Sequence, residues 1–264
     1  MDTVSIGGKK GECVNICINK PESLLVQRGM HAVDIATIPI LGWDSRCTVD
    51  KDLLKGSGTV TMICTILSEV QKRYPYVRLY TFTDNSHITC NNNKTISLLS
   101  LSIIEHRKSW YERNFNACLA DSSMDKKYKD GITTLDDPTL KLPFSEFTSI
   151  ISSYTTPTII QKLQPFYEGA PTYFSFFQNI LETEGKAELC ILVVDWVERF
   201  LIYIFQFNPQ TAQWNIPSDS IKPVAILSET RLNRKPNNQK GGKRRLSRKL
   251  SRGVNINDIL ELSL

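Results

Sequence analysis

The chain has 264 residues, of which 41% are hydrophobic and 22% charged, which is ordinary for a globular protein and excludes disorder throughout. Its formal net charge of +5 is unevenly distributed, because residues 231–252 hold ten Lys and Arg side chains and no Asp or Glu. Removing those ten from the total of 32 leaves 22 basic against 27 acidic residues, near −5, so the body gives no reason to expect a nucleic-acid groove.

The first predicted elements are strands. Residues 14–19 and 23–27 are short runs rich in β-branched and apolar side chains, separated by a turn at Lys20 and Pro21. Residues 31–41 form a longer β-branched run, HAVDIATIPIL, which has the length of a strand. We therefore expect three strands before the first helix.

A helix and a further strand follow. Apolar residues recur at helical spacing over 61–73, and residues 77–83 alternate as a strand that stops at the turn cluster Asp-Asn-Ser. Residues 96–106 again have helical periodicity, and 110–119 are expected as a helix or a helix leading into a strand. Residues 1–120 are thus predicted as one α/β domain with its elements in the order β-β-β-α-β-α.

The rest of the chain has a different pattern. Residues 121–143 are polar and rich in turn formers, which predicts a linker. Residues 144–230 are predicted as a mostly helical domain or extension, with a last strand or two near its end. Residues 231–252 are expected to be a disordered basic tail, and 253–264 carry enough apolar side chains for a short docking element.

The most apolar stretch, residues 189–207, carries Asp195, Glu198 and Arg199 in its middle. Each charge at a bilayer centre costs about 2.5–3.5 kcal/mol, so insertion is disfavoured. We therefore predict a buried amphipathic helix here, and no membrane as a partner.

The seven cysteines are odd in number and scattered, and the polar start MDTVSIGGKKGE lacks the apolar core of a signal peptide. Both features predict free thiols in an intracellular, reducing compartment. Cys13 and Cys17 alternate with apolar residues, which is typical of strand core. The three histidines are far apart and no Cys-x-x-Cys occurs, so no metal site is expected.

One local pattern points to anion binding. A predicted strand is followed by a glycine-rich loop and then a helix, and the loop comprises Lys55, Gly56, Ser57, Gly58 and Thr59. Glycines let backbone N–H groups turn toward one point, and a helix N-terminus adds partial positive charge, which suits a phosphate or pyrophosphate. The loop is neither a Walker A loop nor a dinucleotide fingerprint. A plain strand-to-helix turn is the alternative.

The order of these segments resembles the GNAT N-acetyltransferase superfamily, which implies a GNAT-like mixed sheet with flanking helices for residues 1–120. The strings that carry the resemblance cover residues 23–119 and include HAVDIATIPIL, LLKGSGTV, TMICTILSEVQKRYP, VRLYTFTDNS and SLLSLSIIEHRKSWYERNF. Gly56 and Gly58 match the two glycines of the family's loop, and YERNF at 111–115 is similar to its second helical motif. The same strings also resemble uncharacterised proteins of large DNA viruses of protists, which implies a virus-encoded intracellular protein.

The resemblance implies roles for particular residues. The amides of the loop at 55–59 would hold the pyrophosphate of acetyl-CoA or another acyl-CoA, and Tyr111 would protonate the leaving thiolate. Asp34, on the strand before the loop, is the candidate base, and Asn85 and Ser86 would lie near the acyl carrier. The alternatives stay open: Tyr111 as core, Asp34 as an edge or bulge residue, and Asn85 and Ser86 as turn and cap formers. The acyl acceptor is not identified.

The tail supports a second hypothesis, a non-enzymatic interaction protein in the nucleus or at a viral replication site. The cluster of basic residues in this tail resembles a nuclear import signal and also suits nonspecific nucleic-acid binding. The partner is therefore an import receptor or nucleic acid, and the third alternative is that the tail has no particular partner. The first hypothesis is an acyl-CoA-dependent N-acyltransferase or an inactive descendant that keeps the fold. Leu53 stands where the family has Gln or Arg, which favours the interaction protein over that first hypothesis. The basic residues concerned are Lys243, Arg244, Arg245, Arg248, Lys249 and Arg252.

Overall fold

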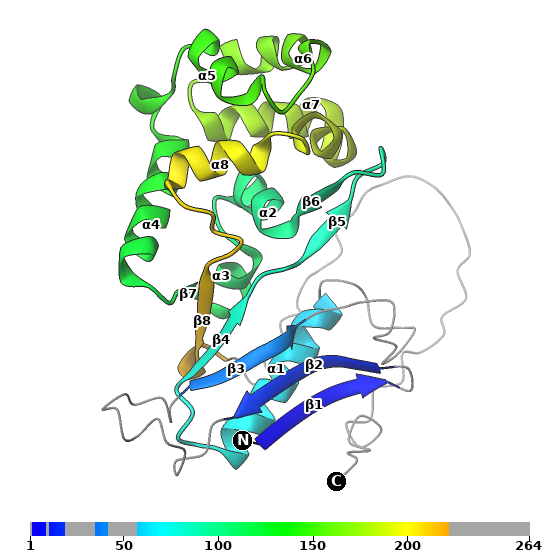
Figure 1. The fold of residues 1–264 in the computed structure, drawn as a ribbon, viewed down its shortest axis with the longest axis vertical. Coiled ribbons are helices and arrows are strands. Elements are labelled where there is room, and N and C mark those ends of the chain that lie inside the picture. Colours follow the sequence, from blue (N-terminus) through cyan, green and yellow to red (C-terminus); the bar gives the residue numbers. More distant parts are fainter. Residues whose placement is uncertain (1, 9–10, 19–34, 42–56, 222–264) are drawn as a thin grey trace, which may run out of the picture.

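The computed structural model describes residues 2–8, 11–18, 35–41 and 57–221. It is a mixed α/β fold, which confirms the predicted class (Figure 1). The elements in chain order are β1 Asp2–Gly8, β2 Gly11–Ile18, β3 Ile35–Leu41, α1 Ser57–Arg73, β4 Leu79–Thr83, β5 His87–Thr89, β6 Thr95–Ser97, α2 Leu98–His106, α3 Trp110–Phe115, β7 Cys118–Leu119, α4 Ser122–Asp136, the 3-10 turn η3 Pro138–Leu140, α5 Phe144–Ile151, α6 Pro157–Glu168, α7 Tyr173–Val193, α8 Val197–Phe205, β8 Gln213–Pro217 and the 3-10 turn η4 Ser218–Ser220.

The main sheet has six strands in the order β1-β2-β3-β4-β8-β7. Strands β3 and β4 run parallel, because α1 crosses between them, and the other neighbouring pairs are antiparallel. Strand β8 comes from the far end of the helical half and is inserted between β4 and β7 (Figure 1). The sheet therefore combines strands from both halves of the chain.

Most of the predicted elements before residue 120 are confirmed within a few residues of their expected bounds. Strands β2, β3 and β4, helices α1 and α2, and the helix-to-strand transition from α3 into β7 all form. Strand β1 was not predicted, because its alternation is short and is interrupted by glycines. The strand predicted at 23–27 lies outside the described residues.

One face of the sheet carries the core. Val14, Ile16 and Ile18 of β2 are fully buried, as the alternation of a strand requires. The apolar stripe of α1 is buried as well, and the Tyr80 hydroxyl of β4 donates a hydrogen bond to the Leu67 carbonyl of α1 at 3.3 Å. Helix α1 thus covers this face beside β4.

The structure differs from the predicted linker at 121–143. Helix α4 begins at Ser122 and is capped by Asp121, whose Oδ1 accepts hydrogen bonds from the backbone N–H groups of Ser123 and Met124. Its few apolar side chains fall on one side, where Tyr128 packs against Phe205 and Trp214. A mostly polar sequence can therefore still form a docked helix, because a few apolar side chains on one face are enough to pack against the core.

The second half is mostly helical, as predicted, and packs around an aromatic cluster. Phe147, Phe176, Phe200 and Trp196 are fully buried and contact one another. The apolar stretch at 189–207 forms the end of α7 and all of α8. Within the described part of the chain, no helix combines the length and apolar composition needed to cross a membrane.

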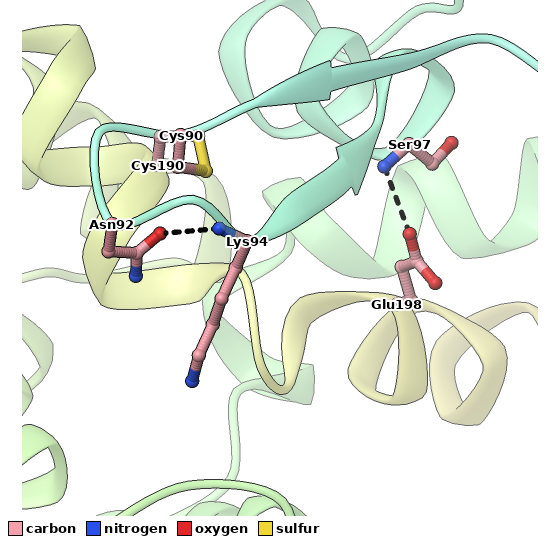
Figure 2. Close-up of a disulfide and its surroundings, with 6 residues drawn as sticks. All are labelled: Cys90, Asn92, Lys94, Ser97, Cys190 and Glu198. Atoms are coloured by element: carbon pink, nitrogen blue, oxygen red, sulfur yellow. Dashed lines mark hydrogen bonds between the residues drawn. A yellow bond between two sulfur atoms is a disulfide. The ribbon is translucent and has the colours of Figure 1, made fainter.

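Among the described cysteines, the prediction of free thiols is wrong for one pair. Cys90, after β5, and Cys190, in α7, form a disulfide with their Cα atoms 5.7 Å apart (Figure 2). Nearby, Lys94 forms an ion pair with Asp195, and the Ser97 N–H donates to Glu198 Oε1 at 3.0 Å. Sequence spacing missed the pair because its members are 100 residues apart. These contacts fix the β5–β6 hairpin to the helical half.

The disulfide should contribute substantially to stability. Closing a loop of this length in the unfolded chain corresponds to about 3–5 kcal/mol. The double variant Cys90→Ser/Cys190→Ser should lose about that much unfolding free energy in denaturant titrations, and dithiothreitol should no longer affect it. Cys118→Ser, which removes a free thiol, is the matched control. A wild-type protein equally stable with and without dithiothreitol would contradict this assignment.

Candidate functional site

The candidate site lies at the carboxyl end of β4. Asp84 follows the last residue of that strand and forms a tight turn with Ser86. Its Oδ1 accepts hydrogen bonds from the Ser86 backbone N–H at 2.9 Å and from Ser86 Oγ at 2.5 Å. The turn leads directly into β5, where Leu98 N–H closes the hairpin base by donating to the Ser86 carbonyl.

Helix α3 brings Tyr111 to this turn. A capping box fixes the start of the helix: Ser109 Oγ accepts from the Glu112 N–H, and Glu112 Oε2 accepts from the Ser109 N–H. The Tyr111 ring packs against Phe82 of β4 with centroids 4.4 Å apart, and against Trp110 at 5.1 Å. The ring is therefore held by aromatic contacts with β4 and with its neighbour in α3.

The Tyr111 hydroxyl donates a hydrogen bond to Asp84 Oδ1 at 3.3 Å. Both side chains are withdrawn from water: Tyr111 is 5% exposed and Asp84 is 1% exposed. Burial raises the pKa of the Tyr111 phenol, and the nearby Asp84 carboxylate raises it further. Burial also raises the pKa of Asp84, although hydrogen bonds from Ser86 and Tyr111 and the charge of His87 oppose the shift. Two acids thus share a hydrogen bond in a site that favours their neutral forms.

Among the described residues, two other aspartates accept the same pair of hydrogen bonds, from the N–H and the hydroxyl two residues further on, and the comparison shows what is special about Asp84. Asp121 accepts hydrogen bonds from the N–H and Oγ of Ser123, and Asp137 accepts them from the N–H and Oγ1 of Thr139. Both carboxylates cap helical turns. Their hydrogen bonds to the side chains and backbone lower their pKa values. Asp84 caps no helix, because a strand follows it, and it is buried against a tyrosine.

A second geometric feature lies beside this site. The parallel pairing of β3 with β4 extends only from Ile35 to Thr37 and from Leu79 to Thr81. Beyond those pairs β3 continues to Leu41 along β2, whereas β4 continues along β8. The two neighbouring strands therefore separate toward their carboxyl ends (Figure 1). Asp84 lies just past the separating end of β4.

The structure brings some predicted site residues together. Ser86 and Tyr111 share Asp84 as a partner, whereas Asn85 is exposed and its carbonyl contacts His87 Nδ1 at 2.8 Å. Ser57, Gly58 and Thr59 form the first turn of α1, which carries no acidic residue. Asp34, Lys55, Gly56 and the tail residues at 243–252 lie outside the described residues.

Asp84 itself was missed as a site residue. The cluster of Asp84, Asn85 and Ser86 predicted a turn, because an Asp side chain can accept a hydrogen bond from the backbone N–H two residues further on. Nothing local distinguishes Asp84 from Asp121, because burial and the contact with Tyr111 depend on a helix 27 residues further along the chain. Only the packing of α3 on β4 provides that signal.

The described residues contain no group of three or more His, Cys, Asp or Glu side chains arranged to hold a metal ion. Comparisons of the chain with protein-family models, curated proteins and solved structures gave no match. The site is therefore interpreted from its own geometry.

The raised pKa of Asp84 should make its contribution to stability depend on pH. The native state holds this proton more tightly than the unfolded state, whose Asp pKa is about 3.9. The unfolding free energy of the wild type minus that of Asp84→Asn should be largest below about pH 4 and should fall as the pH rises through the raised pKa.

Asp121→Asn is the matched control, with the opposite sign. The pKa of Asp121 is lowered, so the wild type should lose stability relative to this variant only as the pH falls below about 4. Denaturant titrations at a series of pH values measure both differences. Equal pH dependence in the two comparisons would show that Asp84 is an ordinary turn residue.

Proposed function

We propose that the chain is an acyl-coenzyme A-dependent N-acyltransferase with a GNAT-like fold. The observation that carries the proposal is the separation of the parallel strands β3 and β4 beyond Thr37 and Thr81. Beyond those pairs the two strands no longer satisfy each other's N–H and C=O groups, and an extended ligand that lies between them would pair with these groups. An acyl carrier with amide groups along its length fits such an opening.

Helix α1 supports the same proposal. It connects β3 to β4, and its first residues, Ser57, Gly58 and Thr59, come from the glycine-rich loop. The N–H groups of the first turn have no partner within the helix, and together with the helix dipole they favour an anion, which no acidic side chain in that turn opposes. This fits the pyrophosphate of coenzyme A.

Tyr111 supports the chemistry. A bound acyl-CoA supplies an activated thioester, so the protein need only position an amine and protonate the departing thiolate. The Tyr111 phenol has an ordinary pKa of about 10, which burial raises, so the hydroxyl is protonated at neutral pH and has a proton to donate. Phe82 and Trp110 hold the ring, which limits the positions that the hydroxyl can take.

Coenzyme A binding tests the proposal directly. At about 100 times its dissociation constant, coenzyme A should raise the unfolding free energy by about 2.7 kcal/mol. Gly58→Val should abolish this gain, because a branched side chain on the first turn of α1 would block the approach of the pyrophosphate. Ala187→Val, at an exposed position of α7, is the control for placing valine in a helix.

Two other outcomes are informative. If the protein unfolds cooperatively and millimolar coenzyme A does not stabilise it, the proposal is wrong. Stabilisation without acyl transfer to any of a panel of amines would identify an inactive descendant that keeps the fold and the cofactor.

The charge of the tail supports a second activity, binding of nucleic acid. Ten basic side chains in 231–252 stand against a body near −5, which should repel phosphate. Deleting 231–252 should therefore abolish binding to labelled oligonucleotides, and in the full chain affinity should fall steeply with salt. Phosphorylation of Ser247 and Ser251 should weaken binding, since each phosphate adds roughly −1.5 to −2 charge.

Fluorescence anisotropy over a salt series, with single- and double-stranded oligonucleotides, measures this affinity. The melting temperature of the truncated protein is the control for folding. Binding that survives truncation, or that does not respond to salt, would place the nucleic-acid site on the body instead.

A further inference from the structure

Helices α4 and α8 pack against each other at a glycine. A Cβ atom on Gly131 of α4 would lie 2.1 Å from Phe205 Cδ1 of α8, so a larger residue would displace this buried ring. Two neighbouring hollows of about 280 and 180 Å³ lie beside the contact, and both are lined by Thr134, Ile204 and Gln206. The surface beside the contact between α4 and α8 is therefore a groove.

The larger hollow of this groove exposes apolar surface. Leu140 and Tyr203 line it, and their exposed fractions are 49% and 50%. Among the described residues, Met124 and Tyr154 are the only other large apolar or aromatic residues that are exposed. No charged side chain lines this hollow. Exposed apolar side chains that gather in an uncharged hollow favour an apolar partner.

The dimensions of the groove indicate the kind of partner that fits. Sites for drug-sized ligands measure about 300–1,000 Å³ and enclose most of the ligand. A hollow of about 280 Å³ with half-exposed walls is better suited to single side chains. A stable complex of two separate proteins uses about 20–30 residues on each side, whereas seven residues line the larger hollow. A short peptide segment that is covalently tethered fits this description.

The chain itself contains such a segment. Residues 254–264, VNINDILELSL, lie outside the described residues, and their sequence places Ile256, Ile259 and Leu260 at the spacing of one helix face. Residues 222–253 connect the segment to Ile221, where the described residues end. A connection of that length can extend to about 100 Å, and a globular body of about 200 residues has a radius of gyration of only about 17 Å. The segment can therefore reach the groove.

We propose that residues 254–264 dock in the groove between α4 and α8, with their apolar side chains in the hollow lined by Leu140 and Tyr203. The basic residues 231–252 then form a loop that is anchored at both ends. The inference is independent of the acyltransferase proposal, because no residue that lines the groove belongs to the candidate site at Asp84.

Hydrogen exchange measures the docking. A flexible tether holds the segment at an effective concentration of about 1 mM, so a dissociation constant of about 0.1 mM gives about ten docked molecules for each free one. Amide protection factors in 254–264 should therefore be about 10-fold higher in the wild type than in Ile259→Ser/Leu260→Ser. Asn255→Ser/Asn257→Ser, which alters the other sides of the predicted helix, is the matched control and should keep the protection. Equal protection factors in all three proteins would overturn the proposal.

Photo-crosslinking in the full chain identifies the occupant. With p-benzoylphenylalanine in place of Tyr203, mass spectrometry should find an intramolecular adduct with residues 254–264, and Ile259→Ser/Leu260→Ser should abolish it. The same replacement at Tyr154, which is 45% exposed and lines neither hollow, is the control and should give no such adduct. An adduct with another part of the chain, an adduct between two copies, or no adduct at position 203 would each overturn the proposal.

Discussion

The pairing of β4 with strands from two distant parts of the chain is the constraint on which the rest of the structure depends. Strand β3 reaches it through α1 and runs parallel, whereas β8 returns after the helical half and runs antiparallel. The pairing with β3 ends at Thr81, and the pairing with β8 continues to Thr83. The carboxyl end of β4 is therefore positioned by the helical half, and so is Asp84, which follows it.

Burial, and not the local turn, sets the direction in which the pKa of Asp84 is shifted. Asp84, Asp121 and Asp137 form the same turn, yet the pKa is raised in the first and lowered in the other two. Hydrogen bonds to a carboxylate favour its charged form, but removing it from water disfavours that form more strongly at Asp84. The aromatic packing of α3 on β4 excludes water from Asp84. The same contacts therefore build this part of the core and raise the pKa of the Asp84 carboxyl.

The β5–β6 hairpin connects the site to the helical half. Two strands of three residues are marginal by themselves, and an exposed ion pair such as Lys94 with Asp195 adds little. The disulfide between Cys90 and Cys190, together with the hydrogen bond to Glu198, holds the hairpin on α7 and α8 (Figure 2). The base of the hairpin is the turn that contains Ser86, so these distant contacts limit its motion.

The sequence by itself determined the local elements, because periodicity and turn formers act over a few residues. It predicted α1, β4, α2 and the start of α3, and it selected Tyr111 and Ser86. It misjudged α4, whose few apolar side chains resemble a linker until Phe205 and Trp214 cover Tyr128. Tertiary structure alone decided the insertion of β8, the pairing of Cys90 with Cys190 and the burial of Asp84. Each of these depends on residues far apart in the chain, and no local pattern records which distant surface will exclude water from a given side chain.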